Sequence, residues 1–109
     1  MIDEQEFRVR CDAALEDLYK ALGQAADDYD FDPDMNNGAL SVAFEDPPAK
    51  FVVSPQAPVR QIWVSAHSKS FKLDWDAGRG DFVLSETGDS LKQMIAKAIS
   101  QQLGESVSL

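Results

Sequence analysis

Five aspartates between residues 27 and 34 are the densest group of side chains that could do chemistry. They are Asp27, Asp28, Asp30, Asp32 and Asp34, here called the aspartate segment. In an extended chain, alternate side chains share a face about 7 Å apart, so these carboxylates could flank a hydrated cation. Few of them could contact the same ion directly. We therefore expect weak, exchangeable binding of hard cations that keep most of their waters.

The spacing of the aspartate segment superficially resembles the start of an EF-hand loop. That motif needs glycine at the position of Pro33 and a bidentate glutamate at the position of Ala39, so an EF-hand is excluded. A solvated connector that keeps the protein soluble is the other interpretation of these residues. The pattern alone leaves both interpretations open.

A second candidate surface surrounds Trp63. Ile62 and Val64 alternate with Gln61, Trp63 and Ser65, which predicts a half-buried strand. Period two places the aliphatic residues on the covered side of a sheet and the tryptophan on the open side. A tryptophan among polar neighbours on a solvated face is a good interface anchor. Packing of Trp63 under a loop or against neighbouring strands is the alternative.

The sequence contains no recognisable catalytic set. The single histidine, His67, has no nucleophile at a catalytic spacing, and the single cysteine, Cys11, falls on the apolar stripe of a predicted helix. No Walker loop, HExxH or CxxC motif is present. We expect no enzyme activity from these residues, and no structural zinc.

The net charge of −9 is concentrated in the first third of the chain. Residues 1–34 hold eleven acids and three bases, whereas residues 35–109 hold eight acids and seven bases. This charge argues against nucleic acid as a partner, because phosphate contacts need a basic patch. No apolar stretch approaches the roughly 18 residues that span a bilayer, and no signal peptide is visible. We expect a cytoplasmic protein whose partners are cations or basic protein surfaces.

The elements that must position these residues follow from hydrophobic periodicity. Apolar residues at three- and four-residue spacing predict helices over residues 3–24 and 90–103, with the aspartate segment as a polar connector between the first helix and a turn at 36–38. Five strands are predicted, at about residues 40–45, 51–53, 60–67, 71–75 and 81–85, with a turn at 46–48. We expect one α+β domain over residues 1–109, with both helices on one face of an antiparallel sheet.

Residues 55–65 resemble the central signature of the frataxin family, a Gln-x-Pro-x-x-Gln-hydrophobe-Trp run. The matching residues here are Gln56, Pro58, Gln61, Ile62 and Trp63. Further matches are Asn37-Gly38-Ala39-Leu40, Asp74-Trp75 and Gly88-Asp89-Ser90-Leu91 at the entry to the last helix. The resemblance covers nearly the whole chain, from about residue 6 to residue 103. The short chain is similar to the bacterial CyaY-like branch.

This resemblance implies an α-β-α sandwich that binds iron (Fe²⁺ or Fe³⁺) weakly through an acidic ridge. It also implies docking on a cysteine desulfurase and an iron–sulfur scaffold protein, in a mainly monomeric protein that can form iron-dependent oligomers. Carried over by residue, the ridge comprises the aspartate segment, with Glu16 and Asp17 further up the helix. The partner-binding sheet surface comprises Gln56, Gln61 and Trp63.

The chain departs from the family pattern at three places. Ser54 replaces a common asparagine, Gly23 and Gln24 stand where bacterial members often have glutamates, and the connector before Asn36 is shorter. The ridge therefore has fewer carboxylates than is usual.

Three functions are compatible with these residues. The first is an iron-binding regulator or adaptor of iron–sulfur cluster assembly. The second is ferroxidase or iron-storage activity on the same ridge, which we expect to be inefficient because dedicated di-iron oxidases combine Glu and His ligands inside a bundle. The third is a metal-independent acidic inhibitor that binds its partner through charge.

Overall fold

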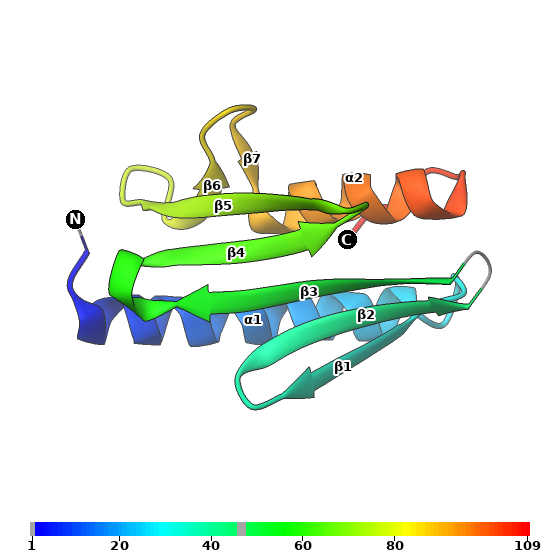
Figure 1. Ribbon diagram of the computed structural model, residues 1–109, viewed down its shortest axis with the longest axis horizontal. Helices are drawn as coiled ribbons and strands as arrows, with labels where there is room; N and C mark the ends of the chain where they lie inside the picture. Colours follow the sequence, from blue (N-terminus) through cyan, green and yellow to red (C-terminus); the bar gives the residue numbers. More distant parts are fainter. Residues whose placement is uncertain (1, 46–47) are drawn as a thin grey trace.

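Two helices cover one face of an antiparallel sheet, and both run in the same direction along it (Figure 1). The computed structural model describes residues 2–45 and 48–109. The helices are α1 (Glu4–Ala25) and α2 (Leu91–Leu103), with a short 3-10 helix η1 (Ala57–Val59). The strands are β1 (Asp32–Asn36), β2 (Ala39–Glu45), β3 (Pro48–Gln56), β4 (Gln61–Ala66), β5 (Lys69–Asp76), β6 (Asp81–Leu84) and β7 (Asp89–Ser90).

Every strand of the sheet pairs with the next one along the chain, in the order β1 to β7. The predicted α+β class, the antiparallel meander and the placement of both helices on one face are therefore confirmed. The described residues form seven strands instead of the predicted five or so. The two additional strands, β1 and β7, lie at the sheet edges, where pairing on one side only is enough to define them.

The prediction of a connector was wrong for the second half of the aspartate segment. Asp32 and Asp34 lie in β1, where they face Ala43 and Ser41 of β2. Aspartate and proline are depleted in strands, so local propensity argued against this assignment. Pairing with the more apolar β2 overrides that propensity.

Helix α1 forms where the apolar periodicity predicted it. Its buried face consists of Phe7, Cys11, Leu15, Leu18, Leu22 and Ala25. Asp3 caps the first turn, because its carboxylate accepts a hydrogen bond of 2.8 Å from the Glu6 backbone N–H. Helix α1 therefore presents one apolar stripe to the sheet and a charged face to water.

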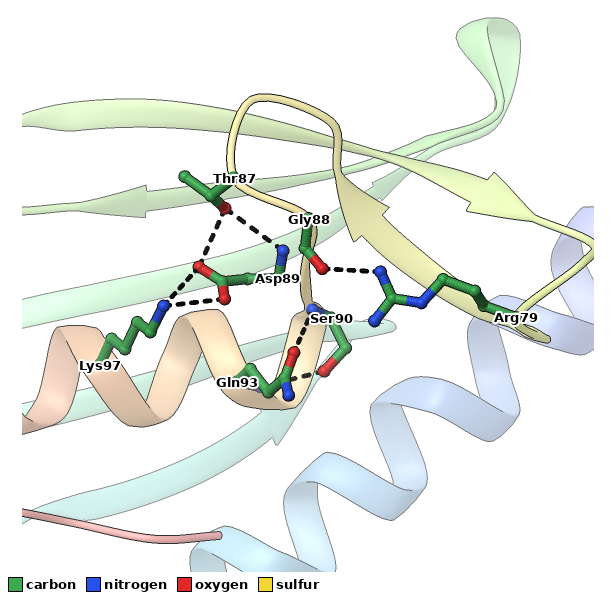
Figure 2. Close-up of polar contacts among 7 residues, drawn as sticks. All are labelled: Arg79, Thr87, Gly88, Asp89, Ser90, Gln93 and Lys97. Carbon is green, nitrogen blue, oxygen red and sulfur yellow. Dashed lines mark hydrogen bonds and ion pairs between the residues drawn. The ribbon is translucent and has the colours of Figure 1, made fainter.

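Helix α2 begins at a capping box, shown in Figure 2. The Ser90 hydroxyl accepts a hydrogen bond from the Gln93 backbone N–H at 3.2 Å, and the Gln93 side chain accepts one from the Ser90 N–H at 3.0 Å. Lys97 pairs with Asp89 at 2.8 Å and Arg79 donates to the Gly88 carbonyl at 2.6 Å. The Lys97–Asp89 pair holds the β6–β7 hairpin against α2, and the Arg79 contact joins the β5–β6 loop to the turn of that hairpin.

The core lies between the helices and the covered face of the sheet. Along β4, Ile62, Val64 and Ala66 are buried, whereas Trp63 and Ser65 are exposed, as period two predicted. Strand β3 is longer than the predicted residues 51–53, because pairing with β4 continues through Pro55 and Gln56. Of the predicted turn at 46–48, Asp46 and Pro47 lie outside the described residues, and Pro48 begins β3.

Candidate functional site

The aspartate segment joins the end of α1 to the edge strand β1, and all five of its side chains are exposed. Asp27 and Asp28 follow the last turn of α1, where the Asp28 N–H donates to the Ala25 carbonyl at 2.9 Å. The carbonyl end of a helix carries partial negative charge, which normally attracts Lys or Arg. The last turn of α1 contains no basic residue. Carboxylates and helix dipole therefore add to the same negative potential.

No base forms an ion pair with the aspartate segment within the part of the chain that the structure describes. The ion pairs found there are Arg8–Glu4, Arg10–Glu6, Lys92–Asp17 and Lys97–Asp89. None of them involves the aspartate segment. An exposed set of carboxylates without ion-pair partners attracts cations and basic surfaces from solution.

The aspartate segment does not form a closed chelating site. Within residues 2–45 and 48–109, no three His, Cys, Asp or Glu side chains are placed to hold one metal ion together. Carboxylate oxygens are nevertheless the donors that hard cations prefer. The arrangement therefore suits a hydrated cation that touches one or two carboxylates and exchanges readily.

The two remaining predicted metal ligands lie on α1, and their surroundings differ. Asp17 pairs with Lys92 of α2 at 2.8 Å, so its charge is largely compensated across the two helices. Glu16 is exposed on α1. The structure thus distinguishes the unpaired aspartates after α1 from the paired Asp17.

The predicted partner-binding residues lie on the open face of the sheet, away from the helices. Gln56 and Gln61 are cross-strand partners, and Trp63 is 36% exposed. Trp63 Nε1 donates a hydrogen bond to Gln61 Oε1 at 2.9 Å, while Gln56 Nε2 donates to Ser54 Oγ at 3.3 Å. The structure therefore brings Gln61 and Trp63 into direct contact.

The β1 part of the aspartate segment and the Trp63 surroundings share one face of the sheet. Asp34 pairs with Ser41, Ser41 with Val52, and Val52 with Ser65, so these four side chains point the same way. Ser65 and Trp63 are alternate residues of β4, which places Trp63 on this face as well. Three strand spacings of about 4.8 Å separate β1 from β4, or roughly 14 Å. One protein partner of ordinary interface size can therefore span both surfaces.

The sequence pattern did not place two further residues beside Trp63, although Asp74 was named within a family match. Asp74 accepts a hydrogen bond of 3.0 Å from Gln61 Nε2, and Lys72 Nζ lies 5.1 Å from the centroid of the Trp63 ring. Both residues lie on β5, opposite Gln61 and Trp63 respectively. Predicting these two contacts requires the register between β4 and β5. That register is set by the tight turn at His67 and Ser68, which have left-handed backbone angles.

Cys11 and His67, for which the sequence indicated no catalytic role, both pack within the fold. Cys11 is buried in the core, and burial, followed by the nearby Asp12 charge, raises the pKa of its thiol to about 12. The thiol therefore stays protonated and packs as a small apolar group. His67 Nε2 lies 3.0 Å from the Ala98 carbonyl of α2, and its ring packs against Phe51.

The described helices include none that is long and apolar enough to cross a membrane.

Residues 1–105 match the family model of the frataxin-like domain. The chain belongs to the frataxin-like family. This assignment confirms the resemblance that residues 55–65 indicated.

Relatives within the frataxin-like family match this chain over most of its length. It is 36% identical over 93 residues to the iron–sulfur cluster assembly protein CyaY of Azotobacter vinelandii, covering 84% of each chain. It is 37% identical over 102 residues to the protein of the same name from Pseudomonas aeruginosa, covering 88% of this chain and 94% of the relative. The CyaY-like branch is therefore the part of the family that this chain resembles.

A solved frataxin structure supports the fold independently. The frataxin of Psychromonas ingrahamii superposes with a TM-score of 0.75 at 23% sequence identity. The match covers 98% of this chain and 97% of that structure. The α-β sandwich of this frataxin-like chain is thus the fold of a known family member.

Proposed function

We propose that this chain acts in iron–sulfur cluster assembly as a non-enzymatic adaptor or regulator. It docks on a cysteine desulfurase and its scaffold protein, and it binds Fe²⁺ or Fe³⁺ weakly through surface carboxylates. The relatives from Azotobacter vinelandii and Pseudomonas aeruginosa bear the name of iron–sulfur cluster assembly proteins, which supports the general role. The residues of the two exposed surfaces support the mode of action.

One observation carries the proposal: the aspartate segment follows the carbonyl end of α1, whose last turn has no basic residue, and it forms no ion pair in the described chain. Folding alone would favour a lysine or arginine at this position. Violations of such local rules concentrate at functional sites. The aspartates are therefore suited to meet positive charge supplied from outside, either a cation or a basic protein surface.

In this proposal the protein binds iron weakly and passes it on, so that iron is not a permanent cofactor. Exposed carboxylates that do not converge on one point retain a cation mainly through its hydration shell and long-range attraction. Such binding is weak and salt-sensitive, and it leaves the ion available for transfer. Ferroxidase or iron-storage chemistry receives less support, because the described residues do not bring oxidase-type ligands together.

The metal site is tested by replacing Asp27, Asp28, Asp30 and Asp32 with Asn. Paramagnetic Fe²⁺ broadens the NMR signals of nearby residues, and the parent protein should lose signals selectively around the aspartate segment. The fourfold variant should lose this selective broadening. A control carries Glu4→Gln and Glu6→Gln, which removes two carboxylates already paired with arginines. Broadening at the segment that persists in the fourfold variant would reject these aspartates as the iron site.

The alternative is a metal-independent inhibitor that binds the desulfurase by charge alone. This alternative is considered because the described residues do not form a closed metal site. A pull-down on purified desulfurase with Fe²⁺ and with strict chelator separates the two functions. Equal binding in chelator supports the metal-independent form, and a Trp63→Arg variant tests the sheet face separately from the aspartate segment.

A further inference from the structure

A chain of hydrogen-bonded side chains on the open face of the sheet ends at Trp63. Trp63 Nε1 donates to Gln61 Oε1 at 2.9 Å, and Gln61 Nε2 donates to Asp74 Oδ1 at 3.0 Å. Gln61 and Trp63 are alternate residues of β4, and Asp74 is the cross-strand partner of Gln61 on β5. Strand geometry brings all three side chains to the same face and within reach of each other.

Only one orientation of the Gln61 amide satisfies both contacts. The indole N–H of Trp63 is a donor only, and an ionised Asp74 carboxylate is an acceptor only. The amide oxygen must therefore face Trp63 and the amide nitrogen must face Asp74, as the structure has it. Because a hydrogen bond to a charged group is stronger than a neutral one, Asp74 determines the orientation of the amide.

Lys72 restrains the same indole ring by a different contact. It is the cross-strand partner of Trp63, and its Nζ lies 5.1 Å from the ring centroid, within the range of a cation–π interaction. The ring is thus held both at its N–H group and by a cation, although it stays 36% exposed. A restrained, exposed aromatic ring loses little conformational entropy when a partner covers it.

We propose that Asp74 is a positioning residue, which acts through Gln61 to hold the Trp63 ring ready for contact with the desulfurase–scaffold complex. This inference rests on the proposed function for the identity of the partner. Because Gln61 already accepts from the indole N–H, the partner meets the ring as an apolar surface beside the Lys72 ammonium. The complementary patch on the partner is an apolar pocket flanked by a carboxylate.

The first test uses the free protein and does not depend on any partner. In NMR spectra of the ¹⁵N-labelled protein, the indole signal of Trp63 is the one that disappears in a Trp63→Phe variant. Its hydrogen exchange should be about three- to tenfold faster in Asp74→Ala, which corresponds to the loss of one hydrogen bond. Asp74→Asn keeps an acceptor oxygen and should restore most of the protection.

The control for this test removes an equal charge elsewhere. Glu86→Ala alters an exposed carboxylate in the turn between β6 and β7 and leaves Trp63, Gln61 and Asp74 unchanged. It should leave the Trp63 indole signal unaltered. If Asp74→Ala also leaves the exchange rate of that signal unaltered, Asp74 does not position Trp63 and the inference is wrong.

The second test measures affinity for the purified desulfurase–scaffold complex. Asp74→Ala should weaken binding about three- to tenfold, and Asp74→Asn should weaken it less. In a Trp63→Ala background, Asp74→Ala should cause no further loss, because its effect passes through the ring. An equal loss in both backgrounds would show that Asp74 acts independently of Trp63. If the parent protein does not bind the complex, the proposed function and the docking role both fall, while the exchange test still decides whether Asp74 orders the ring.

Discussion

Individual side chains in this protein show how a carboxylate can serve either structure or function. Asp89 is engaged by Lys97 and Thr87, and it fastens the β6–β7 hairpin to α2 (Figure 2). Asp17 is paired with Lys92. The aspartates after α1 have no such partner among the described residues. Sequence patterns do not separate these classes, because the pairing depends on contacts between residues that are distant along the chain.

The Asp89 contacts predict a specific pH dependence of stability. Hydrogen bonding from Lys97, and then from Thr87, lowers the pKa of the Asp89 carboxyl below its usual value. A lowered pKa in the folded state adds stability above the unfolded pKa of about 3.9, and this stability is lost as the pH falls through the folded pKa. Asp89→Asn should therefore reduce the free energy of unfolding at pH 7, with a smaller deficit at pH 3.

Urea denaturation of the parent protein and Asp89→Asn at both pH values measures this difference. Glu86→Gln is the control, since it removes a nearby exposed carboxylate without touching Lys97 or Thr87. A deficit of the same size at pH 3 and pH 7 would mean that the Asp89 charge does not contribute to stability.

At the level of elements, strong periodicity made the helices and the central strands predictable. The predicted helix over residues 3–24 is α1 (Glu4–Ala25), and Asp3 caps its first turn. The edge strand β1 was missed because its residues are polar and its proline has no N–H to donate to a ladder. Only pairing with β2 defines this strand, and pairing is a property of the fold as a whole.

Helix α1 should gain stability when its C-terminal carboxylates are neutralised. Asp27→Asn with Asp28→Asn removes negative charge from the negative end of the helix dipole. We expect the free energy of unfolding to rise by about 0.3–1 kcal/mol at low ionic strength, and less at high salt. The same change should weaken binding to the desulfurase, which is the trade-off expected of a functional site.

Urea denaturation at two salt concentrations tests this prediction. Asp12→Asn, an exposed site in the middle of α1, is the control and should have a smaller effect. If the double variant is less stable than the parent protein at low salt, the two aspartates support the fold and the argument from the helix dipole fails.

For the whole molecule, the folded chain places Asp32 and Asp34 of β1 on the same open face of the sheet as the exposed tryptophan. The sequence predicted both features separately: the carboxylates of the aspartate segment, and Trp63 on the side of β4 that does not face the core. Their relation could not be predicted, because it depends on β1 joining the sheet three strands away from β4. The network of Trp63, Gln61 and Asp74 was hidden for the same reason, since it needs the β4–β5 register.

The affinity for purified cysteine desulfurase tests the central claim, that position and not total charge makes the aspartate segment a docking surface. Two variants lose the same four charges: one carries Asp27→Asn, Asp28→Asn, Asp30→Asn and Asp32→Asn, and the other carries Glu4→Gln, Glu6→Gln, Asp12→Asn and Glu105→Gln. The first should bind about tenfold or more weakly than the parent protein at low salt, and the second within about threefold of it. Equal losses in the two variants would contradict the claim.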